Sequence, residues 1–383
     1  MILSAIFVLL VALFVLLDRF QQYLRTSEIL RAPAQVSSDG LRPAQHSKPS
    51  GAGTAHERSS LCNSFYGTIC KKSGESRDPT GIVRPDIEGE IEALRIYEEI
   101  IRQHRDWTSD QVDEELVKVI YTPERRGRIE SAFRWVRQTL ERVIDRERRT
   151  VFTAQEKTML KQRIRGTRLE LPPPAALYAD EPDIFTKNEV FYERTMDGQT
   201  RMRVGGAYLF TSKSWFNVIF TLAHEFGHAI DPCELRSAGL SFPAYDRLTA
   251  CFLQFGWVPL HKDRSTECGE NDQLSEIFAD WLAVRVTAEA LKTFATEFHA
   301  TQLVGAAVNA VRDLCEQDDP QLEVDLTNHP APQFRIESIF GRNPKVREIL
   351  GCGPAPGSEY CSFEFQPPVL DQAEPFAQSQ TRF

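Results

Sequence analysis

The segment 215–230 constrains this chain most, because an almost continuous apolar stretch carries two histidines and a glutamate within five positions. It reads WFNVIFTLAHEFGHAI, and Pro232 follows closely, which predicts one helix that ends at the proline. On this helix His224 and His228 are four residues apart, so their rings leave the same face one turn apart. Two neutral imidazoles at this spacing can share a tetrahedral zinc ion. Glu225 would lie beside the remaining ligand position, able to take a proton from a water molecule there.

A zinc site needs a third ligand, and the helix expected over about 272–297 offers one. Its segment QLSEIFADWLA places Glu276 and Asp280 four residues apart on one face of an otherwise apolar helix. Burying carboxylates on an apolar face is costly unless they are paired or bind a metal ion. We therefore expect Glu276 to be the third ligand and Asp280 to orient a ligand histidine through a hydrogen bond. The alternative is that both carboxylates face solvent.

Other stretches narrow the class of protein. The residues after His228 read AIDPCE, which excludes the Gly-and-His continuation of metzincins. Together with HExxH and Glu-x-x-x-Asp, four stretches resemble the neprilysin and endothelin-converting-enzyme family of zinc peptidases. They are CNSFYGTIC (62–70), CFLQFG (251–256), HPAPQFRI (329–336), and GC (351–352) followed by Cys361. Asp231 also fits the family's HExxHxxD extension, and the matches cover both ends of the soluble part of the chain.

The resemblance implies a role for each residue of the two helices. Zinc would be bound by His224, His228 and Glu276, one ion per chain, and Glu225 would be the general base. Asp280 would hydrogen-bond the ring of His224. The implied activity is that of a zinc-dependent endopeptidase, which hydrolyses peptide bonds with an activated water molecule.

The same resemblance assigns residues outside the two helices. His329 would donate a hydrogen bond to the oxyanion that forms at the attacked carbonyl, where a fixed donor stabilises negative charge. Arg335 would grip a backbone carbonyl of the substrate. Asn188 resembles the first residue of the family's substrate-binding strand, and Phe191 takes its aromatic position, although Glu189 replaces the usual alanine. An edge strand there could pair with an extended peptide as an added strand.

The chain has eight cysteines, for which the sequence alone permits about 105 complete pairings. The absence of any Cys-x-x-Cys makes a cysteine–zinc cluster a poor alternative. The resemblance implies four disulfides: Cys62–Cys352, Cys70–Cys315, Cys251–Cys361 and Cys233–Cys268. Four such bonds require an oxidising compartment.

The N-terminus carries the membrane signal of this chain. Residues 2–17 are apolar except for Ser4, so 1–18 is expected to be a membrane anchor or a signal segment. Arginines follow this segment, and the positive-inside rule would leave the rest of the chain in the cytosol. The four disulfides implied above would instead place the rest of the chain on the non-cytosolic side of the membrane. We therefore expect a membrane-anchored or secreted protein whose catalytic domain lies in an oxidising extracytoplasmic compartment, joined by a flexible stalk at 19–60 that is rich in Ser, Pro, Ala and Gly.

The remaining residues, 61–383, are expected to form one metallopeptidase domain of the α+β class, predominantly helical. Residues 83–170 would be a reduced helical lobe, with a capping box at Thr153 and Glu156. Residues 171–383 would be the zinc-binding catalytic lobe, of the gluzincin type. Its small edge sheet is expected within 188–210, as two strands around an Asp-Gly turn. Because the helical cap is much shorter than that of the family, the cleft should be more open and accept larger substrates.

The expected partners are a peptide or protein substrate and, through the N-terminal apolar segment, a membrane. A net charge of −9 gives no reason to expect nucleic acid. Two alternatives stay open. One is a thermolysin-like peptidase of another family, in which the cysteine matches are coincidental. The other is a catalytically silent, zinc-containing envelope protein that binds peptides, although the intact Glu225 argues against it, since a structural site needs no base.

Overall fold

The computed structural model describes residues 54–73, 85–173, 183–210, 214–257, 268, 273–295, 300–317, 329–355 and 360–366. The apolar segment 1–18 and most of the expected stalk lie outside these residues. Helix α2 (Thr54–Asn63) includes the last residues, 54–60, of the segment expected to be the stalk. No helix within the described ranges is both long and apolar enough to cross a membrane.

Four helices fill the region that was expected to be helical between residues 83 and 170. They are α4 (Pro85–Gln103), α5 (Ser109–Ile120), α6 (Pro123–Arg146) and α7 (Ala154–Gly166). The capping box predicted at the start of α7 is present, because the Thr153 side chain accepts from the Glu156 amide and the Glu156 side chain accepts from the Thr153 amide. Helix α6 packs along both α7 and α9, which joins this region to the candidate site.

A three-stranded mixed sheet follows, in the order β1-β3-β2. Strand β1 (Arg168–Glu170) pairs in parallel with β3 (Thr200–Val204), and β2 (Val190–Arg194) pairs with β3 in antiparallel. The β2–β3 turn contains Gly198 at a φ of 80°, a conformation that glycine adopts without steric cost. The predicted hairpin is therefore confirmed, with β2 as an edge strand. Residues 206–210 continue as the short helix α8 (Gly206–Phe210).

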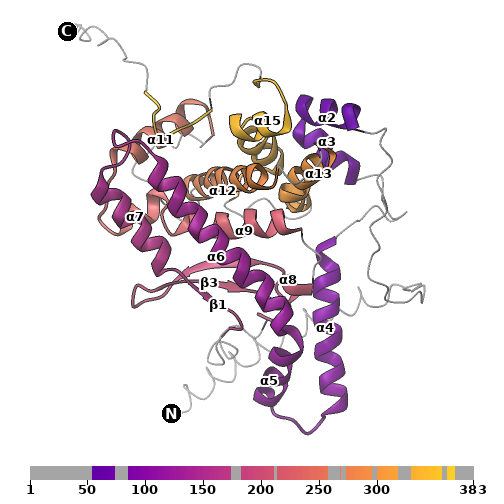
Figure 1. Ribbon diagram of the computed structural model, residues 1–383. Coiled ribbons are helices and arrows are strands. Elements are labelled where there is room, and N and C mark those ends of the chain that lie inside the picture. The colour runs from indigo at the N-terminus through magenta and orange to yellow at the C-terminus, as the bar shows by residue number, and fades with distance from the viewer. Residues whose placement is uncertain are drawn as a thin grey trace, which may run out of the picture. The chain divides into compact units, whose positions relative to one another are not determined.

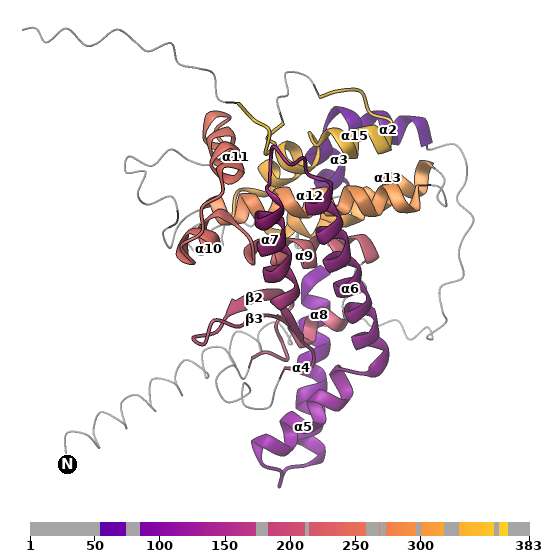
Figure 2. The ribbon, with the colours of Figure 1, turned by 60° about the vertical axis from the view of Figure 1, so that its left-hand side comes forward.

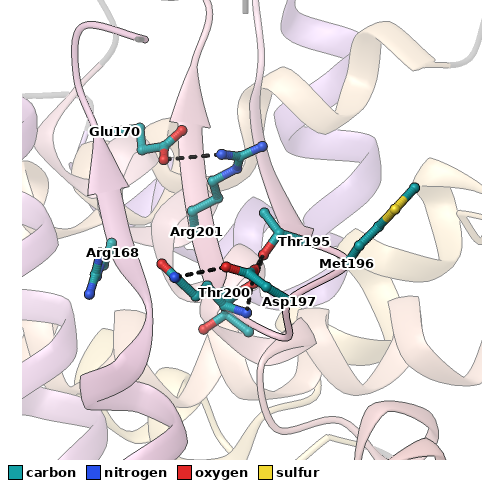
Figure 3. Close-up of a pocket in the computed structure, with 8 residues that line it drawn as sticks. Arg168, Glu170, Thr195, Met196, Asp197, Thr200 and Arg201 are labelled. Carbon is teal, nitrogen blue, oxygen red and sulfur yellow. Dashed lines mark hydrogen bonds and ion pairs between the residues drawn. The ribbon is translucent and has the colours of Figure 1, made fainter. Parts of the chain in front are cut away.

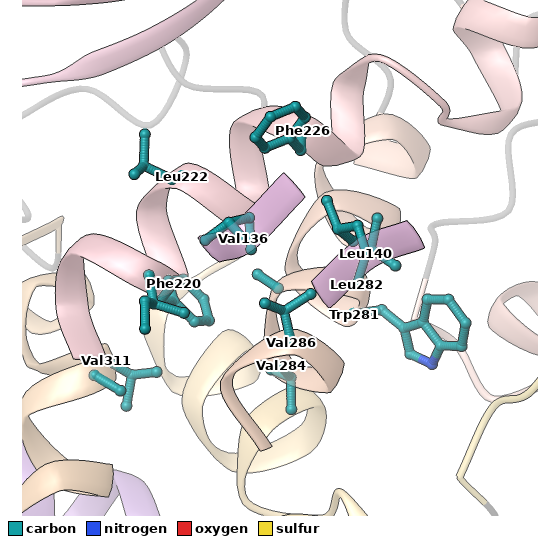
Figure 4. Close-up of a cluster of buried hydrophobic side chains, with 14 of the residues drawn as sticks. Val136, Leu140, Phe220, Leu222, Phe226, Trp281, Leu282, Val284, Val286 and Val311 are labelled. Carbon is teal, nitrogen blue, oxygen red and sulfur yellow. The ribbon is translucent and has the colours of Figure 1, made fainter. Parts of the chain in front are cut away.

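The centre of the fold is the pair of helices α9 (Trp215–His228) and α12 (Gln273–Phe294), which pack along each other. The sheet lies on one side of α9, and α2 and α15 (Pro344–Leu350) lie on the other (Figure 1; Figure 2). Figure 4 shows the apolar cluster that α9 and α12 share with α6; it includes Val136, Leu140, Leu222, Phe226, Leu282 and Val286. The two helices predicted to carry the candidate ligands are thus held face to face by burial of their apolar side chains.

Gly227 allows α9 and α12 to approach this closely. A Cβ atom at this position would lie 2.6 Å from the Cα atom of Ala279 on α12 and 2.9 Å from its Cβ atom. Both distances are below any ordinary van der Waals contact, so a side chain at residue 227 would push the helices apart. Since His224 and His228 lie on the same helix as Gly227, their distance to α12 depends on this glycine.

Gly227→Ala is therefore expected to lower the free energy of unfolding by about 1–3 kcal/mol, the usual cost of overpacking a core, and to weaken metal binding. Denaturant unfolding of the purified chain, followed by metal titration, measures both. The matched control is Gly305→Ala in α13 (Ala300–Val311), where nothing lies within 4 Å of the added Cβ. That control should raise stability by about 0.5–1 kcal/mol, because alanine favours a helix over glycine. Equal effects of the two substitutions would contradict the role of Gly227.

The other helices connect and cover this centre. They are α3 (Phe65–Ser73), α10 (Pro232–Ser237), α11 (Pro243–Gln254), the 3₁₀ helix η4 (Arg312–Gln317), α14 (Pro332–Phe334) and the π-helix η6 (Arg335–Phe340). Within the described residues the chain is thus predominantly helical with one small sheet, which confirms the expected α+β class.

Four disulfides link segments that are far apart in the sequence. Their pairs are Cys62–Cys352, Cys70–Cys315, Cys233–Cys268 and Cys251–Cys361. All four agree with the pairing that the family resemblance implied. Two of them join α2 and α3 to the C-terminal part of the fold. Since disulfides form and persist in oxidising environments, they indicate an extracytoplasmic compartment.

Candidate metal centre

Helices α9 and α12 bring His224, His228 and Glu276 together at one point. The Nε2 atoms of the two histidines are 3.2 Å apart. Glu276 Oε2 lies 3.1 Å from His224 Nε2 and 3.7 Å from His228 Nε2. Ligand atoms at 2.0–2.1 Å from a tetrahedral ion are about 3.3 Å from one another. The three atoms therefore have nearly the spacing of one face of such a tetrahedron, and the group could hold a metal ion.

Glu276 supports this conclusion independently. Its Oε2 atom is shielded from solvent yet accepts no well-aligned hydrogen bond, although three imidazole nitrogens lie around it. Burial alone would raise the pKa of Glu276, but His224 and His329 hold it far below its usual value, so the side chain is an anion. The imidazoles thus offset the charge, but a buried oxygen that lacks an aligned donor is still costly. A cation between this oxygen and the imidazoles would remove that cost.

His224 is oriented by a buried carboxylate, as expected. Its Nδ1 atom lies 2.9 Å from Asp280 Oδ1, and both side chains are almost fully buried. Burial opposes protonation of His224, but Asp280 and Glu276 outweigh it and raise the pKa of the imidazole to about 10. With its Nδ1 atom directed at Asp280, the ring turns Nε2 toward His228 and Glu276. Binding of a metal ion at Nε2 would displace the proton that the two carboxylates retain.

Arg335 contacts the same carboxylate as His224. Its Nε and Nη2 atoms donate to Asp280 over 2.6 and 2.8 Å, and the residue is 3% exposed. Burial alone would raise the pKa of Asp280, but Arg335 and His224 hold it well below its usual range. The guanidinium that was expected to contact a substrate carbonyl thus contacts the carboxylate behind His224, and its substrate role stays a prediction.

Glu225 lies next to His224 on α9 and is buried. Its Oε2 atom accepts a hydrogen bond of 2.8 Å from the backbone amide of Tyr192, on the edge strand β2. Burial raises the pKa of this carboxyl. The amides of Thr195 and Gly205 donate to carbonyl groups across the hairpin, between β2 and β3. Because the backbone groups of successive residues in a strand face alternate sides, the amide of Tyr192 faces away from β3. Sequence reasoning missed Tyr192, because the register of β2 is needed to know which amides face outward.

His329 also reaches the cluster. Its Nε2 atom lies 2.8 Å from Glu276 Oε2, and its ring stacks against that of His224 with centroids 5.6 Å apart. Burial lowers the pKa of His329, which favours the neutral ring. Asn188 stands just before β2 and is partly buried, and its role in binding stays a prediction. The sequence also gave no signal for Ser275, whose hydroxyl lies 3.0 Å from His228 Nδ1.

A separate surface pocket lies at the turn of the β2–β3 hairpin (Figure 3). Its volume is about 360 Å³, and its lining includes Arg168, Glu170, Met196 and Arg201. In Figure 3, Arg201 is paired with Glu170 and Met196 points away from the pair. None of the candidate ligands lines this pocket, so it is distinct from the metal centre.

Comparison with known proteins adds no assignment: no protein-family model matches the chain, and no curated protein sequence matches it either.

Proposed function

We propose that this chain is a zinc-dependent endopeptidase related to the neprilysin and endothelin-converting-enzyme family. The observation that carries the proposal is the convergence of His224, His228 and Glu276 with Glu225 beside them. Two neutral imidazoles and one carboxylate are a ligand set typical of catalytic zinc, which keeps a fourth position for water or substrate. The pairing of all eight cysteines supports this family over a thermolysin-like enzyme.

When bound here, zinc would supply a Lewis acid that polarises the peptide carbonyl and lowers the pKa of a water molecule toward about 7. Glu225 takes a proton from the attacking water and later delivers it to the nitrogen of the leaving amine. Tyr192 holds the carboxylate of Glu225 in place through its backbone amide. His329 donates to the carbonyl oxygen as it gains negative charge. Since the nucleophile is water, no covalent acyl-enzyme forms.

The edge of β2 that faces away from β3 is the proposed binding surface for an extended peptide. By the alternation of the strand, the backbone groups of Val190 and Arg194 face the same side as the amide of Tyr192, away from β3. Because the backbone amide of Tyr192 already donates to Glu225, a peptide would pair with the backbone groups of Val190 and Arg194 on either side of it. This arrangement would place a scissile bond near Glu225.

The proposal is tested by incubating the purified full-length chain with a mixed peptide library, with and without a chelator. Cleavage should occur at internal bonds, stop on chelation and return when zinc is added. If the chain bound zinc but left every peptide intact, the proposed peptidase activity would be contradicted, and the catalytically silent, peptide-binding alternative would be favoured.

The third ligand is tested by Glu276→Gln. The neutral amide should weaken zinc binding by at least about tenfold, because it removes the anionic ligand from the set. Metal content per chain and competition with a chromophoric chelator measure the change. Glu289→Gln is the matched control, since it alters the same helix at a residue that pairs with Arg146 and Lys345 instead. Unchanged zinc affinity in Glu276→Gln would show that this residue is not a ligand.

A further inference from the structure

We propose that Ser275 and Asp231 form a hydrogen-bond relay that holds the ring proton of His228 on Nδ1, so that the Nε2 atom can bind a metal ion. Ser275 Oγ lies 3.0 Å from His228 Nδ1 and 2.7 Å from Asp231 Oδ2. A direct bond between His228 and Asp231 is not made, because Nδ1 and Oδ2 are 3.7 Å apart. The hydroxyl therefore connects the imidazole to the carboxylate. The inference rests on the metal site proposed above, and not on peptide hydrolysis.

The direction of each hydrogen bond in the relay follows from Asp231. This residue caps the N-terminus of α10, where its Oδ1 atom accepts from the amides of Cys233 and Glu234, each at 2.7 Å. The hydroxyl of Ser275 donates its one proton to the other oxygen of this side chain, Oδ2. The oxygen of Ser275 then offers a lone pair to His228, and the imidazole must donate from Nδ1.

The consequence for His228 is a fixed tautomer. With the ring proton on Nδ1, the Nε2 atom carries a lone pair, and it is this atom that lies 3.2 Å from His224 Nε2 at the metal centre. His224 is oriented instead by a direct contact of its Nδ1 atom with Asp280, and a metal ion would have to displace the second proton from its Nε2 atom. The two ligand histidines are thus oriented by different groups. A carboxylate contacts His224 directly, whereas His228 contacts a hydroxyl that is itself hydrogen-bonded to a carboxylate.

The relay also joins the metal centre to the neighbouring structure. Ser275 directly precedes Glu276 on α12, so one turn of helix supplies both a metal ligand and the group that orients another. Asp231 follows the end of α9 and begins α10, and it is 3% exposed. Since Asp231 is held by two backbone amides before any metal binds, its position does not depend on the ion. Ser275 and Asp231 are positioning residues that act through His228.

Three substitutions test the relay. Ser275→Ala removes the hydroxyl and should lower zinc affinity roughly 10- to 100-fold, the usual effect of losing a group that orients a ligand. Ser275→Thr keeps a hydroxyl and should restore most of the affinity. Asp231→Asn keeps an oxygen for the two cap amides, but its NH₂ group would donate to Ser275. The hydroxyl would then donate to His228 Nδ1 and move the ring proton to Nε2, so this variant should also lose affinity roughly 10- to 100-fold.

The measurements are zinc affinity by chelator competition, the visible absorption spectrum of the cobalt-substituted chain, and thermal unfolding in chelator to confirm that each variant folds. Ser237→Ala is the control, because its hydroxyl caps a nearby carbonyl on α10 and touches no ligand. Wild-type affinity in both Ser275→Ala and Asp231→Asn would overturn the relay, and so would a folded Ser275→Thr as weak as Ser275→Ala. If the unaltered chain bound no zinc, the metal site and the relay would fail together. If it bound zinc but cleaved no peptide, only the proposed peptidase activity would be contradicted, and the metal site and the relay would stand.

Discussion

Glu225→Gln is expected to lower peptide hydrolysis by at least about a hundredfold while the zinc content stays that of the unaltered chain. The amide has nearly the shape of the carboxylate, and its oxygen can still accept the hydrogen bond from the backbone of Tyr192. It cannot take a proton from water at neutral pH. The substitution therefore removes the base and leaves the three ligand atoms in place.

Initial cleavage rates and metal content must be measured on the same preparation, so that loss of zinc cannot pass for loss of the base. Glu114→Gln is a suitable control, because that residue is exposed on α5, away from the ligand helices. The control should cleave at the rate of the unaltered chain. If Glu225→Gln cleaved at that rate as well, Glu225 would not be the general base.

Asp280→Ala is expected to lower the free energy of unfolding by about 3–5 kcal/mol, which is the usual cost of breaking a buried ion pair. Asp280 is 1% exposed and accepts two hydrogen bonds from Arg335, which is itself 3% exposed. Without the carboxylate, the guanidinium stays buried with its charge uncompensated, and His224 loses the group that orients its ring.

Denaturant unfolding in the presence of a chelator measures this effect on the metal-free chain, so that zinc binding does not contribute to the result. Asp145→Ala provides the comparison, because Asp145 pairs with Lys161 and its own side chain is 53% exposed. An exposed pair of this kind contributes no more than about 1 kcal/mol. Similar losses in the two variants would show that the Asp280–Arg335 pair is not stabilising in the way its burial implies.

Local signals in the sequence predicted much of the secondary structure. The apolar pattern and Pro232 predicted one helix that ends at the proline, and α9 spans Trp215–His228. Thr153 and Glu156 marked the start of α7, and the Asp-Gly pair marked the β2–β3 turn. These features are decided by contacts between residues a few positions apart, which is why the sequence alone reveals them. The pairing of the cysteines came from the family resemblance, since spacing alone leaves many connectivities open.

The tertiary structure decided how these elements meet. The spacing of His224 and His228 is a property of one helix, but their distance to Glu276 depends on the close approach of α9 and α12 at Gly227. The contact of Tyr192 with Glu225 depends on the register of β2, and that of Ser275 with His228 on the crossing of two helices. A one-dimensional pattern specifies which face of a helix is apolar. It does not specify which polar atoms lie opposite each other after two faces have packed, because that depends on the shape and volume of every side chain between them.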